Sequence, residues 1–346
     1  MDTRDTPEQA ELRRAARQLV RELGPATVAE LDDATRAKRL AAAVTGAGWL
    51  ELRDDAGDGV ALAGGVEAAI VAEALGSAVA DVAFSGPLLA RDLERRSGIA
   101  PSDRAVVAFG SALDDVATVR DGVTVTPLFG LDVDRETEHA YVVVPEGDAF
   151  RLAFARVDAR AVATDLTRAL AEIPAGTPVH AVADQARLLT PADLAAWSAL
   201  GLALTSADLV GIMRGVLDLT VAYAGARKQY GVPVGSFQAV QHLLAEARCL
   251  MEGSLSATAY ASWSVDARAP EDARQAGRVA KAYSARAART SCETAIQVHG
   301  GIGNTWDCLA HLYLRRALLS SQWFGDDDVQ LRALQDERLG VRDGLS

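Results

Sequence analysis

The sequence predicts a mainly α-helical protein with a small β-domain in the middle. Three observations support this fold class. Both ends of the chain have apolar residues spaced three and four apart, as amphipathic helices require. Residues 104–188 instead have short runs of β-branched residues separated by Gly, Asp and Pro, which is typical of strands and turns. With 346 residues, 49% of them hydrophobic, the chain can bury a substantial core in two or three structural units.

Residues 1–100 are expected to form an N-terminal helical domain. Residues 11–20 (ELRRAARQLV) have the helical spacing, and residues 66–75 (VEAAIVAEAL) predict a second, more apolar helix that ends at Gly76. The glycine-rich residues 57–65 between them predict a loop.

Residues 101–188 are expected to form a reduced middle β-domain. Strands are predicted for the runs rich in β-branched residues, at 105–109, 123–126, 140–144 and 179–182. Turn residues separate these runs, so they predict a small sheet or barrel.

Residues 189–346 are expected to form a four-helix bundle. Thr190 is a suitable N-cap, with Pro191 at the first helical position. Ser236 is a second suitable N-cap, and Thr305 is expected to open the last helix after a glycine-rich turn. The four helices are predicted at about 190–224, 236–265, 270–298 and 305–323.

Charge and cysteine content limit the function classes. A net charge of −12 argues against a nucleic-acid or anionic-membrane surface. Cys249, Cys292 and Cys308 have neither metal-ligand nor disulfide spacing, so no metal is expected and a reduced, cytoplasmic location fits best. The N-terminal residues lack the apolar core of a signal peptide, and no uninterrupted apolar run predicts a membrane span.

Residues 227–242 (RKQYGVPVGSFQAVQH) join two predicted helices. Arg227 is expected at the end of the first helix, and Phe237 and Gln238 at the start of the next. A guanidinium beside the backbone amides of a helix N-terminus suits a diphosphate. An interhelical turn with a solvated arginine explains the same local pattern.

Residues 297–305 (QVHGGIGNT) form the second motif. Gly300, Gly301 and Gly303 permit close approach of the backbone to a ligand. The stretch is expected to open a helix at Thr305, whose amides can face an anion. A helix rather than a strand precedes it, so it is not a Rossmann-type fingerprint, and a plain helix–helix turn is again the alternative.

Together, the two motifs closely resemble the C-terminal bundle of the acyl-CoA dehydrogenase family in sequence and separation. The resemblance covers residues 190–325 and, less specifically, residues 1–98, including GAGWLEL at 46–52. It implies an N-terminal helical domain, a middle β-domain, a C-terminal four-helix bundle and FAD as the cofactor. It also implies which residues contact the ADP half of FAD across a subunit interface: Arg227, Gln229, Phe237, Gln238, Gln297, His299, Gly300 and Gly301.

The sequence departs from the family at the catalytic base. The reaction requires a carboxylate that removes the α-proton of an acyl-CoA thioester while a hydride moves to the flavin. The family places this glutamate at one of two positions, which here hold Gly201 and Phe324. Neither residue can accept a proton. The family's flavin-ring segment also has no counterpart in the middle region.

These losses resemble the short subunits of α2β2 acyl-CoA dehydrogenases that act on steroid-derived CoA thioesters. The resemblance implies a larger partner subunit that supplies the base and the flavin-ring pocket, a CoA-thioester substrate and an electron-transfer acceptor. The first function considered is therefore a non-catalytic, FAD-sharing subunit that is inactive when isolated.

Two alternatives stay open. One is a homomeric flavoenzyme of the same fold (dehydrogenase, oxidase or monooxygenase) with a displaced carboxylate base, for which Asp307 and Asp326 are candidates. Each acid also has a structural explanation: Asp307 would lie in the first turn of the helix opened by Thr305, and Asp326 would cap a final short helix. The other alternative is a flavin-free structural or interaction subunit.

Overall fold

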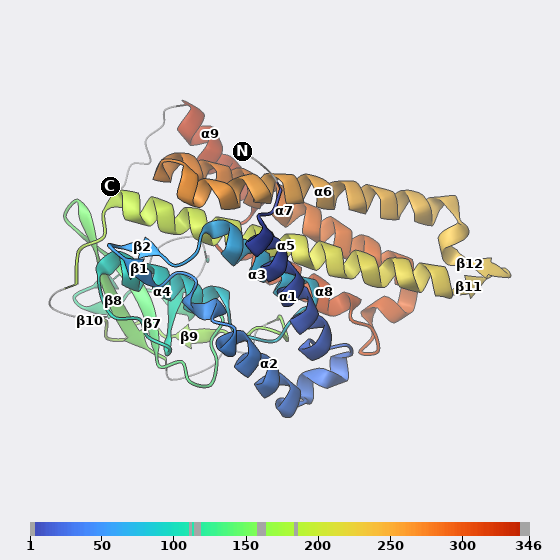
Figure 1. The fold of residues 1–346 in the computed structure, drawn as a ribbon, viewed down its shortest axis with the longest axis horizontal. Helices are drawn as coiled ribbons and strands as arrows, with labels where there is room; N and C mark the ends of the chain where they lie inside the picture. Colours follow the sequence, from blue (N-terminus) through green and yellow to red (C-terminus); the bar gives the residue numbers. More distant parts are fainter. Residues whose placement is uncertain (1–3, 111–112, 114–118, 158–163, 183–185, 340–346) are drawn as a thin grey trace.

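The computed structural model describes residues 4–110, 113, 119–157, 164–182 and 186–339, whose arrangement is shown in Figure 1. Helices come first along the chain, a sheet follows, and long helices form the C-terminal bundle. The mainly helical fold class with a small β-domain is therefore confirmed. The predicted domain boundaries near residues 100 and 188 lie in connections between elements and stay a prediction.

The N-terminal part contains both helices that the sequence predicted, with two others. The helices are α1 (Pro7–Leu23), α2 (Ala34–Gly46), α3 (Gly65–Ser77) and α4 (Ser85–Ser97), joined in part by short 3-10 turns at Val28–Asp32 and Trp49–Glu51. The glycine-rich stretch predicted as a loop takes part in a small hairpin of β1 (Asp55–Gly57) and β2 (Val60–Ala61). Both α3 and α4 are largely buried, because they lie between α5 and the rest of the N-terminal part and sheet.

The middle part contains a six-stranded sheet with the order β10-β8-β7-β3-β6-β9 within the described residues. Neighbours are antiparallel except β3 and β7, which are parallel. The strands are β3 (Ala105–Phe109), β6 (Leu128–Gly130), β7 (His139–Glu146), β8 (Ala149–Arg156), β9 (Ala171–Ile173) and β10 (His180–Ala181), with a separate hairpin of β4 (Val119–Arg120) and β5 (Val123–Thr124). The sequence missed β8 because its alanines and arginines have low strand propensity; eight paired residues along β7 make it a strand.

The C-terminal part is a bundle of long helices. They are α5 (Pro191–Ala226), α6 (Gln238–Ala267), α7 (Pro270–His299), α8 (Ala310–Gln322) and α9 (Asp327–Leu339). Thr190 caps α5 as predicted, and its hydroxyl accepts the Asp193 amide. Two predicted helix starts are wrong. The Ser236 hydroxyl donates to the Pro233 carbonyl within a 3-10 turn, and Phe237 is the N-cap of α6. Helix α8 begins at Ala310 rather than at Thr305, because the glycine-rich residues form another 3-10 turn.

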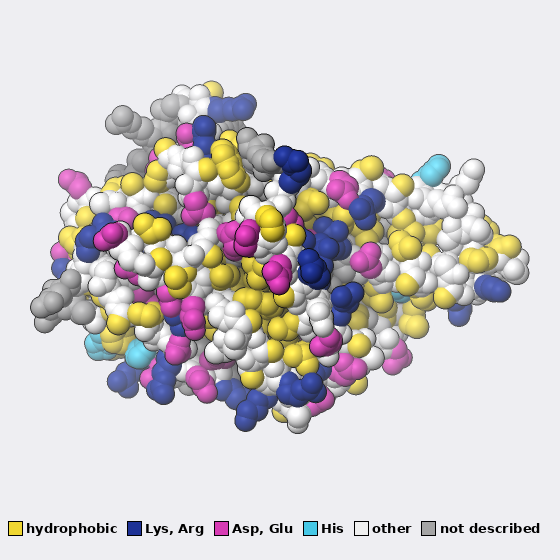
Figure 2. Space-filling view, viewed as in Figure 1, with side chains coloured by type: hydrophobic (Ala, Val, Ile, Leu, Met, Phe, Trp, Pro, Cys, Tyr) yellow, Lys and Arg dark blue, Asp and Glu magenta, His cyan; other side chains and the backbone are white. Residues whose placement is uncertain are grey.

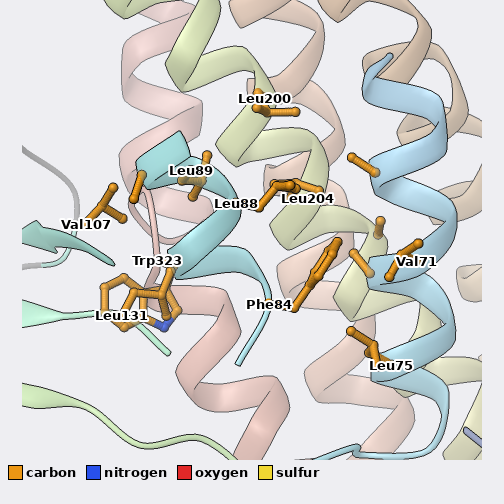
Figure 3. Packing of buried hydrophobic residues seen from close by; sticks show 14 of the residues in the cluster. Val71, Leu75, Phe84, Leu88, Leu89, Val107, Leu131, Leu200, Leu204 and Trp323 are labelled. Carbon is orange, nitrogen blue, oxygen red and sulfur yellow. The ribbon is translucent and has the colours of Figure 1, made fainter. Parts of the chain in front are cut away.

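Helix α5 is the core of the molecule. It is long and apolar enough to cross a membrane, yet 89% of its most apolar 18-residue stretch is buried by other parts of the chain, as expected of a core helix. Figure 3 shows Leu88 of α4 packed toward Leu204 of α5, with Trp323 beside Leu131 at the edge of the sheet. One continuous apolar core thus joins the N-terminal helices, the sheet and the bundle.

A buried ion-pair cluster, centred on Asp208 of α5, crosses this core. Its carboxylate lies 2.8 Å from Nη2 of Arg316 in α8 and 3.1 Å from Nη2 of Arg168, which precedes β9. Ser320 donates to the second carboxylate oxygen at 2.7 Å. Burial acts to raise the pKa of Asp208, but the two guanidiniums outweigh it and hold the pKa below its usual value.

We expect Asp208→Asn to lower the free energy of unfolding by about 3–5 kcal/mol, because the buried Arg316 loses its ion-pair partner and the buried Arg168 keeps only Asp132, 3.3 Å from its Nε. Urea unfolding at neutral pH measures this, with Glu293→Gln, in an exposed pair with Arg289, as the control that changes little. The folded-state pKa of Asp208 is lowered. Its contribution is therefore complete above the unfolded pKa of about 3.9 and is lost as the pH falls through the folded pKa. If the difference in the free energy of unfolding between the wild type and Asp208→Asn does not decrease at low pH, this account is wrong.

Candidate functional site

The two sequence motifs meet at one end of the bundle. Arg227 is the C-cap of α5, and α7 ends at His299. Tyr223 connects them: its carbonyl accepts the Arg227 amide at 2.8 Å, and its ring stacks on His299 with 4.3 Å between the centroids. The Tyr223 hydroxyl also donates to the His299 carbonyl at 3.3 Å. Two segments 70 residues apart in sequence therefore form one surface.

The first motif forms a hairpin that projects beyond the bundle (Figure 1). Its strands are β11 (Lys228–Gln229) and β12 (Val232–Pro233), and the chain then returns to α5. At Gly235 a Cβ atom would lie only 3.1 Å from the Ala224 carbonyl, so the absent side chain permits this close return. The turn thereby places Arg227 and the first turn of α6 at the same end.

Four of the predicted cofactor residues of this hairpin and of α7 are exposed, whereas His299 is only 6% exposed and its Nδ1 lies 2.8 Å from the Ala295 carbonyl. Arg227, Gln229, Gln238 and Gln297 are exposed, and Arg227 forms no ion pair with any residue that the structure describes. The ring of Phe237 is 38% exposed and lies 6.4 Å from that of Tyr230, which is 93% exposed. Basic and hydrophobic side chains without an acidic one are visible at the hairpin tip in Figure 2. Exposed aromatic rings beside an unpaired guanidinium suit a surface that another molecule covers.

Backbone amides are available on both sides of this surface. α6 has no side-chain cap among the described residues. The Val240 and Gln241 amides donate to the Phe237 carbonyl, which leaves the Gln238 and Ala239 amides as candidate donors to a ligand. In the second motif, Gly300 has φ +66° and ψ −145°, a conformation that favours glycine. The predicted anion-facing helix start at Thr305 is wrong, and the 3-10 turn Gly300–Asn304 occupies that place. Amides of this turn and of α6 are therefore the candidate anion donors.

Gly201 and Phe324, the two positions expected to correspond to the family's glutamate, lie against each other. A Cβ atom at Gly201 would lie 2.0 Å from Cζ of Phe324, so one side chain must fill the space of both. The Phe324 ring lies 4.9 Å from the ring of Phe109 and 5.3 Å from Trp197. Aromatic rings therefore occupy this volume.

A buried lysine holds the chain segment that carries Phe324. Lys281 of α7 is fully buried, and its ammonium donates to the carbonyls of Ser321, Trp323 and Gly325 at 2.7, 2.6 and 2.8 Å. Burial lowers the pKa of Lys281 to about 7, although the charges of two nearby aspartates act to raise it. Phe324 itself has φ +61°, which is uncommon for a bulky residue. The hydrogen bonds from Lys281 to the backbone carbonyls thus hold the turn in a conformation that is unfavourable for Phe324.

The two candidate displaced bases lie elsewhere. Asp326 caps α9, and its carboxylate accepts the Val329 amide at 3.0 Å, as the structural explanation predicted. Asp307 is exposed, but it lies before α8 rather than in its first turn, so that explanation is wrong. Neither acid belongs to the aromatic cluster around Phe324.

Gly201 lies in the first third of α5, whereas Arg227 directly follows the last residue of that helix. At about 1.5 Å per residue, the helix separates Gly201 from Arg227 by about 39 Å. A single FAD molecule cannot span this distance. Sequence reasoning did not single out Tyr223 or Lys281, although a tyrosine one turn before Arg227 and the only lysine of the α7 segment were visible signals.

Comparison with known proteins agrees with this geometry. Residues 200–339 match the family model of the acyl-CoA dehydrogenase C-terminal domain. Acyl-CoA dehydrogenase FadE34 from Mycobacterium tuberculosis is 46% identical over 115 residues, which are 32% of this chain and only 16% of FadE34. Acyl-CoA dehydrogenase IpdE2 from the same organism is 30% identical over 279 residues, 78% of this chain and 77% of IpdE2.

Two solved structures share the fold. The Tcur3481–Tcur3483 steroid ACAD superposes with a TM-score of 0.79 at 24% identity, covering 96% of this chain and 98% of that one. The ChsE4–ChsE5 complex from Mycobacterium tuberculosis gives a TM-score of 0.79 at 23% identity, covering 99% and 100%. The match to most of IpdE2, together with the match to the C-terminal domain, shows that the chain belongs to the acyl-CoA dehydrogenase family.

Proposed function

We propose that this chain is a subunit of an FAD-dependent acyl-CoA dehydrogenase and contributes the ADP half of an FAD site shared with a larger subunit. The observation that carries the proposal is the contact between Gly201 and the Phe324 ring. Because aromatic rings fill the space of both family base positions, this chain cannot remove an α-proton there. The larger subunit supplies the base.

The exposed end of the bundle has the residues that an ADP moiety requires. The Arg227 guanidinium offers a planar set of donors that matches phosphate oxygens, and the free amides of α6 add backbone donors. In this proposal Phe237 and Gln238 lie along the adenosine, and Gln229 lies near the diphosphate. The remaining contacts come from the second motif: Gln297, His299, Gly300 and Gly301. When bound, FAD accepts the hydride from the β-carbon of the thioester.

The length of α5 supports the sharing of FAD between subunits. Arg227 and Gly201, which faces the Phe324 ring, are about 39 Å apart along the helix of one chain. An FAD bound by Arg227 therefore places its flavin ring away from the Phe324 ring of the same chain. A neighbouring subunit with an open flavin-ring pocket completes the site.

The structural neighbours support the proposed partner and substrate classes. Two of them are the two-component ChsE4–ChsE5 complex and the Tcur3481–Tcur3483 steroid ACAD. They support a larger acyl-CoA dehydrogenase subunit as the partner, an α2β2 assembly and a steroid-derived CoA thioester as substrate. A separate electron-transfer acceptor reoxidises the flavin, and the proposed assembly is cytoplasmic.

The isolated chain should be inactive. With excess FAD and short, medium or steroidal acyl-CoA substrates, it should not reduce a ferrocenium acceptor, because it has no base beside the flavin. Co-purified with its larger partner, it should form a heterotetramer with one FAD per heterodimer, measured by native mass and flavin absorbance. A homotetramer with one FAD per chain would contradict the proposal, and Asp307→Ala and Asp326→Ala would then locate the displaced base.

Arg227→Ala should weaken FAD binding by the assembled complex by about 1.5–3 kcal/mol, or one to two decades in Kd, because a charge-assisted contact is lost. Arg227→Lys should weaken FAD binding less than Arg227→Ala does, but it should not reach the wild-type affinity, since the point charge of an ammonium does not reproduce the planar set of guanidinium donors. Gln297→Ala removes neutral hydrogen bonds and should cost about 1 kcal/mol. FAD titration measures all three, with Arg104→Ala, an exposed residue directly before β3, as the control. Unchanged affinity in intact Arg227→Ala complexes would mean that the motif is only an interhelical turn.

Gly201 and Phe324 should be energetically coupled. Gly201→Ala should lower stability by about 1–3 kcal/mol, because the new methyl group overlaps the Phe324 ring. In a Phe324→Ala background the same change should cost almost nothing, since the cavity accepts the methyl group. Chemical unfolding of the two single variants and the double variant measures the coupling. Gly225→Ala, in the same helix but with open space around it, is the matched control. Additive effects would show that the two positions do not share one volume.

A further inference from the structure

A groove between α6, α7 and α9 has no role in the proposed cofactor site. Its volume is about 910 Å³, and the described residues that line it all lie outside the two cofactor motifs. Ala282 and Ala287 of α7 form its buried floor, and leucines of α6 and α9 form its sides. Figure 1 shows α6 and α9 along the upper side of the molecule. The groove is therefore a separate feature of the bundle surface.

Large hydrophobic side chains are exposed in this groove. Each of them is between 44% and 67% exposed: Val279 and Tyr283 of α7, and Leu331 and Leu339 of α9. Scattered hydrophobic residues are normal on a protein surface, but several that gather in one groove indicate a surface that another molecule covers. The charges at the two ends of the groove indicate which molecule this is.

Helix α9 has opposite charges at its two ends. Asp327 is its first residue and Arg338 its last but one, so the two lie about 16 Å apart along the helix. The helix runs antiparallel to α7. The Gly325 carbonyl, before α9, binds the buried lysine of α7, whereas Glu337, near the end of α9, lies 2.8 Å from Arg278, which comes earlier in α7. The Asp327 end of the groove therefore lies toward the C-terminal end of α7.

Glu246 of α6 adds a second acid at this end of the groove. α6 and α7 form an antiparallel hairpin, because a two-residue connection joins them. At Gly253 of α6 a Cβ atom would lie 2.7 Å from the Tyr283 hydroxyl of α7. Glu246 is about two turns before Gly253, so it lies about two turns beyond Tyr283, toward the C-terminal end of α7. Arg286 lines the same end, so two acids and one base leave a net charge of −1 there, against +1 at Arg338.

The exposed charges of the groove are available to a second molecule. Within the described part of the chain, Glu246, Arg286 and Arg338 form no ion pair. A two-fold axis across the middle of the groove reverses its direction in a second copy of the chain. Arg338 of each copy then faces Glu246 of the other, and the apolar residues meet between them. Two copies thus match both ends of the groove with one contact that is used twice.

We propose that two copies of this chain pack against each other through this groove about a two-fold axis, with Arg338 of each copy facing the Glu246 end of the other. The occupant is a second copy because the charges at the two ends of the groove match those of the same groove reversed. In the proposed α2β2 assembly this contact joins the two copies of this chain, whereas FAD joins each copy to a larger subunit. Only that placement rests on the proposed function.

The first test follows the isolated chain by sedimentation velocity over a series of concentrations, where it should form a homodimer. Val279→Glu should weaken the dimer by about tenfold or more in Kd, because each copy would bury a carboxylate without a partner. Val60→Glu changes a similarly exposed valine on the β1–β2 hairpin and should leave the dimer unchanged. Thermal unfolding shows that both variants are folded.

Charge reversal tests the two-fold arrangement. Arg338→Glu and Glu246→Arg should each weaken the homodimer, because each change places like charges opposite one another twice. An equimolar mixture of the two variants should dimerise as tightly as the wild type, since every contact between the two different chains joins opposite charges. A mixture that associates no better than either variant alone would overturn the proposed arrangement.

A wild-type chain that stays monomeric, or a dimer that Val279→Glu and Val60→Glu affect equally, would overturn the proposal. In the complex with the larger subunit, Val279→Glu should leave a single heterodimer with its FAD, measured by native mass and flavin absorbance. If this variant instead releases the larger subunit, then the larger subunit covers the groove and the inference is wrong. A wild-type complex without FAD would overturn the proposed function, while self-association of the isolated chain still decides this inference.

Discussion

Two guanidinium groups share one buried carboxylate in this molecule. The placement of the sheet and of α8 against α5 depends on this ion-pair cluster. Asp208 belongs to α5, Arg316 to α8 and Arg168 to the segment before β9, so three parts of the chain meet at one point. Such a cluster adds little stability compared with apolar packing, but any arrangement that leaves one charge unpaired is costly. The ion-pair cluster therefore favours one relative placement of α5, α8 and the segment before β9. Because α5 is a single helix, holding it at Asp208 also sets where its two ends lie.

The turn around Phe324 is held through its backbone. Lys281 binds only backbone carbonyls of this turn, so its contacts do not depend on which side chain stands at position 324. The backbone conformation is thus set independently of the residue that it presents. The Phe324 side chain packs with Phe109 and Trp197 and is part of the core. Gly201 accommodates the ring from the facing helix.

The sequence was most informative where local rules decide the structure. The Thr190 cap and the long apolar periodicities gave the start of α5 and the bundle, because capping and helical spacing are encoded within a few residues. Ser236 and Thr305 have the right residue type for a cap, but glycine-rich 3-10 turns delay the following helices. β8 depends on pairing with β7, and the meeting of Gly201 with Phe324 depends on tertiary packing. No local pattern contains that information. The positions of Arg227 and His299 at one end could be inferred only from the family resemblance, since Tyr223 joins them through space.

The separation along α5 between Arg227 and Gly201, which faces the Phe324 ring, has a thermodynamic consequence. If each subunit holds only part of the cofactor, FAD affinity and subunit association are linked, and each must strengthen the other by the same factor. Dilution would then release flavin as subunits part, and added flavin would draw subunits together. The yellow colour of such a protein reports assembly as directly as it reports cofactor content.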